Sequence, residues 1–102
     1  HRFGIHAGEI ETSMMLALRP ELVDMAQAQN FASTSQQRAQ RMPILGDGSS
    51  AKLAWATQDL NPHGAAGNAR AATADKGRTV LQASGVALAA LLAEVDQLPP
   101  LV

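Results

Sequence analysis

The sequence contains no cysteine and no tyrosine, and its aromatic residues are one tryptophan and two phenylalanines. Without cysteine the chain cannot form a disulfide, a thiolate metal site or a cysteine nucleophile. It also lacks an excess of either charge, because 8 Lys and Arg residues stand against 9 Asp and Glu residues. That balance argues against a nucleic-acid-binding surface, and a chain without disulfides is expected in the cytoplasm.

Long apolar runs are also missing. The longest, from Gly85 to Ala93, is far shorter than the roughly 20 residues that cross a bilayer, and no basic and apolar leader opens the sequence. We therefore expect no membrane partner. The first residue is His1, and the residues that follow lack the polar character of a natural N-terminus, so we expect an upstream part of the same domain to be missing.

The apolar residues that are present are small. They make up 46% of the 102 residues, and many are alanine, which recovers less free energy on burial than leucine or phenylalanine. A chain of this kind is expected to be marginally stable alone and to need a further layer, such as a sheet, to pack against.

Two helices are predicted. The first covers Glu9 to Leu18, with Ile10 and Met14 along one apolar stripe, and it should stop at Arg19 because Pro20 follows. The second begins at Thr73 and reaches Val95. Two glycines, Gly77 and Gly85, lie inside the second helix at a cost of about 1 kcal/mol each relative to Ala, so we expect another backbone to pack closely at both.

The segments between these helices are expected to be irregular. Residues 27–50 are polar and without a period, which predicts a variable surface excursion. Residues 53–56 are the only plausible strand, and residues 61–68 are dense in turn residues, which favours a loop. The chain should thus be mostly helix and loop, with at most one or two short strands.

Potential chemistry is concentrated in residues 6–13, which read His-Ala-Gly-Glu-Ile-Glu-Thr-Ser at a turn into the first helix. An imidazole such as that of His6 can act as a general base or ligate a divalent ion, and carboxylates are stabilised near a helix N-terminus. Gly8 allows the backbone to approach a ligand closely. One helical turn cannot supply three metal ligands, so a metal would need partners from outside this chain. A polar helix start of this composition is also common without any catalytic role.

Residues 6–24 nevertheless resemble the creatininase (creatinine amidohydrolase) family, in which a His-[Ala/Gly]-Gly-x-x-Glu-Thr-Ser segment enters a helix that ends in Pro-x-Leu-Val. Residues 64–77 are similar to the Gly-rich loop of that family and to the Ala-[Thr/Ser]-x-x-Lys-Gly start of its last helix. The two motifs occur in the family's order and cover most of the chain apart from residues 27–50. On this resemblance, residues 1–102 are the C-terminal segment of a single creatininase-like domain.

The resemblance implies an α/β fold with a Rossmann-like parallel sheet flanked by helices, and a homo-oligomer that is commonly a hexamer. It implies a metal-dependent amidohydrolase that cleaves non-peptide, often cyclic, amide or amidine C–N bonds. A divalent zinc, manganese or iron ion would suit the histidine and carboxylate ligands. Most of the family's ligands lie in its N-terminal half, in segments that this sequence does not contain.

Site roles follow by the same resemblance. His6 matches the family's substrate-contacting histidine and would move a proton or hold the substrate carbonyl. Glu11 matches the helix-entry glutamate and would orient His6, or support or contribute to the metal site. Creatininase itself has a Trp-Asp pair before this histidine, where the present sequence has Arg2 and Phe3, so creatinine is disfavoured as the substrate. Arg2 would instead select an anionic group.

Other residues have simpler interpretations. His63 follows Asn61 and Pro62 in a turn and is expected to be solvated, with a role in a neighbouring subunit's site as the alternative. Trp55 is expected to anchor the Ala-rich helices, ahead of forming a stacking wall for a planar ligand.

Two hypotheses stand beside an amidohydrolase. One is a non-catalytic helical module for interaction or oligomerisation, docking through the small residues around Ala87 and Ala90. The other is a degenerate family member that has kept the fold and lost catalysis.

Overall fold

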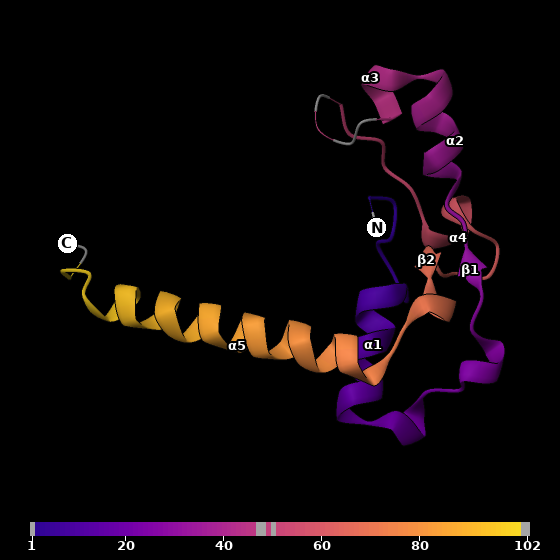
Figure 1. The fold of residues 1–102 in the computed structure, drawn as a ribbon. Coiled ribbons are helices and arrows are strands. Elements are labelled where there is room, and N and C mark those ends of the chain that lie inside the picture. The colour runs from indigo at the N-terminus through magenta and orange to yellow at the C-terminus, as the bar shows by residue number, and fades with distance from the viewer. Residues whose placement is uncertain (1, 47–48, 50, 101–102) are drawn as a thin grey trace.

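The structure is a computed structural model that describes residues 2–46, 49 and 51–100. Short helices and two very short strands cluster around the first helix, α1 (Glu9–Leu18), and the last helix, α5 (Ala74–Asp96), crosses α1 and then projects away from the cluster (Figure 1). Both predicted helices are confirmed, α1 at its predicted bounds and α5 within one residue at each end.

Helix α1 ends where the proline requires. Arg19 leaves the helical conformation, and Pro20 is the first residue of a 3-10 helix, Pro20–Leu22. Proline lacks a backbone N–H and disfavours a helical residue before it, which explains the break. The Arg19 guanidinium hydrogen-bonds the Glu21 carboxylate at this corner and lowers the pKa of that carboxyl.

The buried face of α1 differs from the apolar stripe that the sequence predicts. Leu18, which continues the stripe of Ile10 and Met14 at the same spacing, is 59% exposed, and Met15 is exposed as well, whereas Ser13 is fully buried. The Ser13 Oγ accepts a hydrogen bond of 3.0 Å from the Thr73 backbone N–H, 60 residues further along the chain. The contact with α5 therefore decides which residues of α1 are buried, and the hydropathy of the side chains does not predict this contact.

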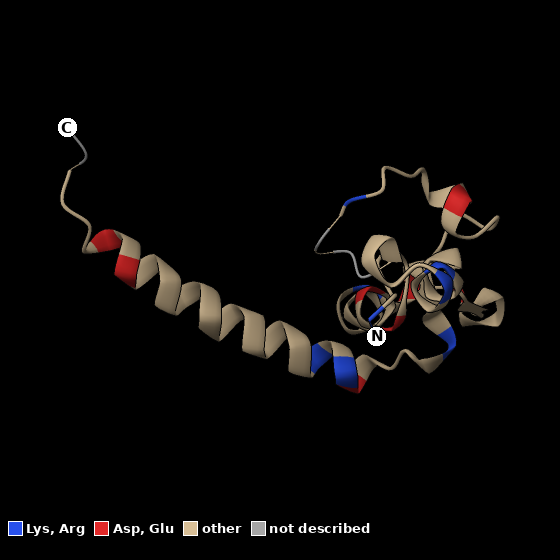
Figure 2. Ribbon diagram, turned by 90° about the horizontal axis from the view of Figure 1, so that it is seen from above, with Lys and Arg blue, Asp and Glu red and all other residues tan. Residues whose placement is uncertain are grey.

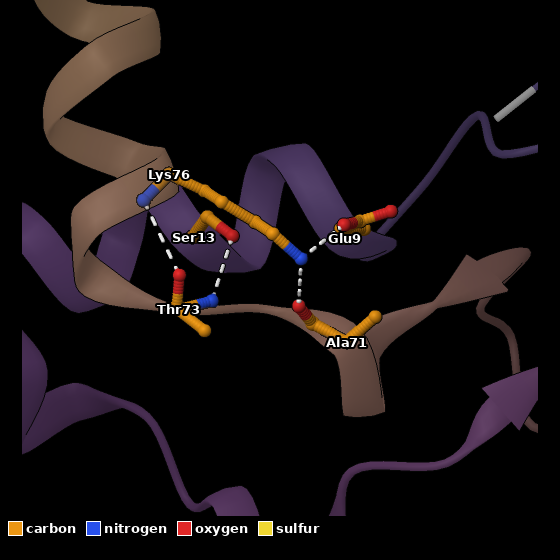
Figure 3. Close-up of polar contacts among 5 residues, drawn as sticks. All are labelled: Glu9, Ser13, Ala71, Thr73 and Lys76. Atoms are coloured by element: carbon orange, nitrogen blue, oxygen red, sulfur yellow. Dashed lines mark hydrogen bonds and ion pairs between the residues drawn. The ribbon is translucent and has the colours of Figure 1, made fainter.

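Gly77 makes that crossing possible. A Cβ atom at this position would lie 1.9 Å from the Ser13 carbonyl oxygen, so only glycine allows the two helices to approach this closely. The same end of α5 is fixed by Lys76, whose Nζ donates to a Glu9 carboxylate oxygen at 2.6 Å and to the Ala71 carbonyl at 2.7 Å (Figure 3). The expectation of a close backbone contact at Gly77 is thus confirmed.

The strands lie where the sequence predicts none. β1 (Asn30–Phe31) and β2 (Gly67–Asn68) pair antiparallel, with Asn30 opposite Asn68 and Phe31 opposite Gly67. Residues 53–56, expected to be the only strand, have no regular structure. Strand propensity predicted the wrong residues because β1 and β2 form by pairing with each other from distant parts of the sequence. Local composition does not encode such a pairing.

The remaining elements are short. Residues 27–50, predicted to be irregular, hold the strand β1 and two helices, α2 (Thr34–Arg41) and α3 (Pro43–Gly46). Ser33 caps α2, because its Oγ accepts the Ser35 backbone N–H. The others are the 3-10 helices Met25–Gln27 and Ala69–Ala71, and the helix α4 (Thr57–Leu60).

The apolar core is small, as the composition predicts. Its buried members come from α4 and the loop and turn that follow, and they are Leu60, Ala65, Ala66, Ala69 and Ala72. Four of the five are alanines, which bury little apolar area each. Within the described residues the only sheet is the antiparallel β1–β2 pair, so the Rossmann-like parallel sheet implied by the resemblance is not part of this structure.

Most of α5 has no neighbour among the described residues. Figure 2 shows its charges confined to the two ends, and the apolar side chains between them, such as Val86 and Leu88, are more than half exposed. No described atom lies within 4 Å of a Cβ built on Gly85, so the contact expected there is absent from this structure. By length and composition alone α5 is able to cross a membrane, although no uninterrupted apolar run is that long; core helices of soluble proteins pass the same test.

Candidate active site

The two sequence motifs meet in space. The segment before α1 forms a bridge with the Gly-rich loop: the Ala66 N–H donates to the His6 carbonyl at 2.9 Å, and the His6 and Ile5 N–H groups both donate to the Ala66 carbonyl at 3.2 and 2.8 Å. Ala66 is fully buried. The backbone of His6 is therefore fixed to the interior of the domain while its side chain faces outward.

Two glycines allow this contact. Gly8 is buried, and a Cβ on it would lie 3.1 Å from the Gly67 Cα, while a Cβ on Gly67 would lie 2.6 Å from the Gly8 Cα. Gly67 also has a φ of 150°, which side chains rarely adopt. Gly8 thus serves a close backbone approach, as expected, but its partner here is the second motif.

His6 and Glu11 lie together at the start of α1. The His6 Nδ1 is 3.8 Å from a Glu11 carboxylate oxygen, and both side chains are about half exposed. The same Glu11 oxygen accepts the backbone N–H of Ala7, which precedes the N-cap residue Gly8, at 2.7 Å. Glu11 is therefore held in place by the backbone, with its carboxylate near the imidazole but beyond hydrogen-bond distance.

Ala7, between these groups, has a φ of 50°. Its conformation is held from both sides, because its N–H is bonded to Glu11 and its carbonyl accepts the Thr12 hydroxyl at 3.3 Å. A left-handed backbone at a residue other than glycine is strained and is common beside functional groups.

Because the backbone at Ala7 is strained, replacing Ala7 with glycine should not lower the free energy of unfolding, unlike most Ala-to-Gly substitutions. Ala7→Gly should leave the free energy of unfolding unchanged or raise it by up to about 1 kcal/mol, since glycine adopts this φ without steric cost. The exposed helical residue Ala89 is the matched control, and Ala89→Gly should lower it by about 0.5–1 kcal/mol. Urea unfolding of both variants measures the difference; a similar loss in both would show that Ala7 is unstrained.

The other polar groups of the motif are used for structure. Glu9 is paired with Lys76, and Ser13 with the Thr73 N–H (Figure 3). The Thr12 hydroxyl is paired with the Ala7 carbonyl. Residues 6–13 therefore do not form one polar cluster. The structure leaves His6 and Glu11 as the pair available for chemistry.

This pair opens onto a cavity of about 490 Å³. Arg2, His6, Gly8 and Glu11, the four residues predicted to act at the site, all line it. The sequence missed two further lining residues, Asn30 of β1 and Asn68 of β2. No local signal marked these two residues, because the strand pairing alone brings them to the cavity.

Residues 1–92 match the family model of creatininase, described as creatinine amidohydrolase. This chain belongs to the creatininase family. A similar solved structure is the "Putative creatinine amidohydrolase from Bacteroides fragilis NCTC 9343", with 27% sequence identity and a TM-score of 0.72. The match covers 98% of the present chain and 38% of that protein, so the chain spans well under half of its length. No curated protein matches.

Creatininase-family members are amidohydrolases that generally depend on a metal. In the part of this chain that the structure describes, no three His, Cys, Asp or Glu residues lie close enough to hold a metal ion. His6 and Glu11 form a pair of the right ligand type, and Glu9 is turned toward Lys76. The described residues therefore do not make up a metal site by themselves.

Two further residues of the creatininase-family chain were given roles from the sequence. Trp55 was expected to anchor the helices, but it is 46% exposed and lines a second cavity instead. His63 is exposed as expected, with its ring centroid 5.7 Å from that of Phe31 and its backbone N–H bonded to the Asn61 side chain. It lines neither cavity.

Proposed function

We propose that the protein carrying this sequence hydrolyses a non-peptide amide or amidine C–N bond, often a cyclic one, in a small molecule, with His6 and Glu11 at the reacting group. The observation that carries the proposal is the docking of residues 5–8 on the Gly-rich loop, which presents the His6–Glu11 pair to one cavity. Family membership supports the reaction class.

The chemistry assigned to these residues is proton transfer. Water adds to the amide carbon and the C–N bond breaks, so the water loses a proton and the leaving nitrogen gains one. The imidazole of His6 can carry that proton or hold the carbonyl oxygen, and Glu11 keeps the ring oriented. As the Ala7 N–H holds the Glu11 carboxylate, the position of Glu11 is set by the backbone before substrate arrives.

We further propose that the enzyme is cytoplasmic, works as a homo-oligomer such as a hexamer, and binds neither nucleic acid nor membranes. Its cofactor is a divalent zinc, manganese or iron ion, with main ligands in an N-terminal portion of the same domain and with Glu11 contributing directly or through a neighbouring ligand. The exposed apolar face of α5 supports packing against that portion.

The test uses the complete protein. Its divalent metal content should be measured after purification, and release of amine or acid should be followed over a panel of cyclic and acyclic amides and amidines. We expect bound metal and turnover of at least one compound, with creatinine among the poor substrates. A protein that is fully folded and metal-loaded yet inert to the whole panel would contradict the proposal and favour a degenerate family member.

A second candidate function is suggested by α5 alone. Its uncharged middle exposes Val86, Leu88 and Leu91, as expected of a helical interaction or oligomerisation module. The same preparation discriminates between the two. A metal-free, inert protein that associates through α5 would support the module instead.

A further inference from the structure

A second cavity adjoins the candidate active site. It has a volume of about 390 Å³ and shares Arg2, Phe3 and Ile5 with the first cavity, so these three residues form the boundary between the two. The rest of its wall comes from α2, the end of α3 and residues 51–55. The two cavities are therefore neighbours along the segment that precedes α1.

The second cavity is lined by cations. Arg2, Arg38 and Lys52 all contribute to it, and no acidic residue is among the described residues of its wall. Within the described part of the chain, neither Arg2 nor Arg38 is paired with a carboxylate. The anion argument therefore rests on Arg2 and Arg38, because guanidinium groups that line a cavity without a carboxylate partner attract and hold anions.

Arg38 is positioned by its own helix. Its guanidinium donates to the hydroxyls of Ser35 and Thr34 at 3.3 and 3.4 Å, and Thr34 in turn donates to the Asp59 carbonyl at 2.9 Å. A guanidinium has five N–H donors, so these contacts fix its direction and leave donors for a ligand. Arg2 is oriented in a different way, with its guanidinium carbon 5.2 Å from the centre of the Phe3 ring.

Two aromatic rings complete the wall. Phe3 and Trp55 both line the cavity, and Trp55 is nearly half exposed although it is the only tryptophan in the chain. Rings beside guanidinium groups accommodate the apolar or planar stem to which an anionic group is attached. The cavity thus combines anion recognition with an apolar surface.

We propose that this second cavity binds the anionic end of the substrate, so that the enzyme selects amides that carry a carboxylate or phosphate on an apolar or planar stem over neutral amides. That the bound anion belongs to a substrate rests on the proposed amide hydrolysis. That the cavity binds anions is independent of the proposed function.

Binding is tested first, without turnover. The complete protein is titrated with benzoate, phenyl phosphate and neutral benzamide while tryptophan fluorescence is recorded. We expect the anions to change the emission and to bind at least about tenfold more tightly than benzamide, and the preferred anion distinguishes a carboxylate from a phosphate. The emission change should be lost in Trp55→Phe, which retains binding by calorimetry.

Arg38→Gln should weaken anion binding about tenfold and leave benzamide unaffected. The matched control is Arg41→Gln, because Arg41 lies on the same helix and lines neither cavity. Equal affinity for benzoate and benzamide, or equal losses in the two variants, would overturn the proposal.

Turnover separates this inference from the proposed function. For any amide that is hydrolysed, Arg38→Gln should lower kcat/KM about tenfold when the amide carries an anionic group and leave it unchanged for a neutral analogue. Hydrolysis without that preference would overturn the substrate assignment alone. Arg38-dependent anion binding in a protein inert to amides would overturn the proposed function and retain the anion site.

Discussion

Replacing His6 with alanine in the complete protein should lower kcat for amide hydrolysis by about 10²- to 10⁴-fold, the contribution usual for a positioned proton-transfer group. The fold should be unaffected, because the imidazole is half exposed and the backbone of His6 supplies the contacts to Ala66. Turnover of the best substrate and the urea unfolding curve measure the two parts of the prediction.

Matched substitutions sharpen the His6 result. Glu11→Gln should cost about 10- to 100-fold, since Glu11 acts by orienting the imidazole. His63→Ala should leave kcat unchanged, because His63 lies outside both cavities. If His6→Ala retained full turnover, the role assigned to His6 would be wrong; a large effect of His63→Ala would instead point to a site shared between subunits.

The largest effect on stability is expected at the helix crossing. Gly77→Ala should lower the free energy of unfolding by about 2 kcal/mol or more, even though alanine is the better helix former by about 1 kcal/mol. The added Cβ meets the Ser13 carbonyl oxygen and carbon, and these backbone atoms can yield only if α1 and α5 move apart. Denaturant unfolding of the variant and parent measures the loss.

Gly85 provides the control on the same helix. A Cβ there meets nothing within 4 Å, so Gly85→Ala should raise stability by up to about 1 kcal/mol. Equal stability of Gly77→Ala and the parent would refute the tight crossing. A loss in Gly85→Ala would reveal a second close backbone contact, supplied from outside the described residues.

The sequence predicted the elements whose causes are local. Helix α1 ends at Leu18 because Pro20 follows, and α5 begins after the N-cap residue Thr73, whose hydroxyl accepts the Lys76 backbone N–H. The candidate site residues His6 and Glu11 were predicted from the family motif, because composition alone does not distinguish them from an ordinary polar helix start. Their meeting with the Gly-rich loop followed from neither source.

Features that depend on contacts across the chain were missed. The strands β1 and β2 form only because they pair with each other, and Ser13 is buried where it accepts the Thr73 N–H. No local sequence pattern predicts either feature. Trp55 was misjudged for a related reason. An aromatic residue among alanines is usually an anchor, but here the Ala-rich helix α5 extends away from the cluster around α1.

The crossing at Gly77 also sets the direction in which the whole of α5 extends. Beyond Leu81 every described residue of the helix is exposed, so its direction is set within the first two turns. At about 1.5 Å per residue, the part of the helix from Gly77 to Asp96 is about 28 Å long, and a tilt of about 5° at the crossing would displace its far end by about 2.5 Å. The crossing angle of α1 and α5 is set by the backbone contact at Gly77. That angle therefore determines the position of the far end of α5.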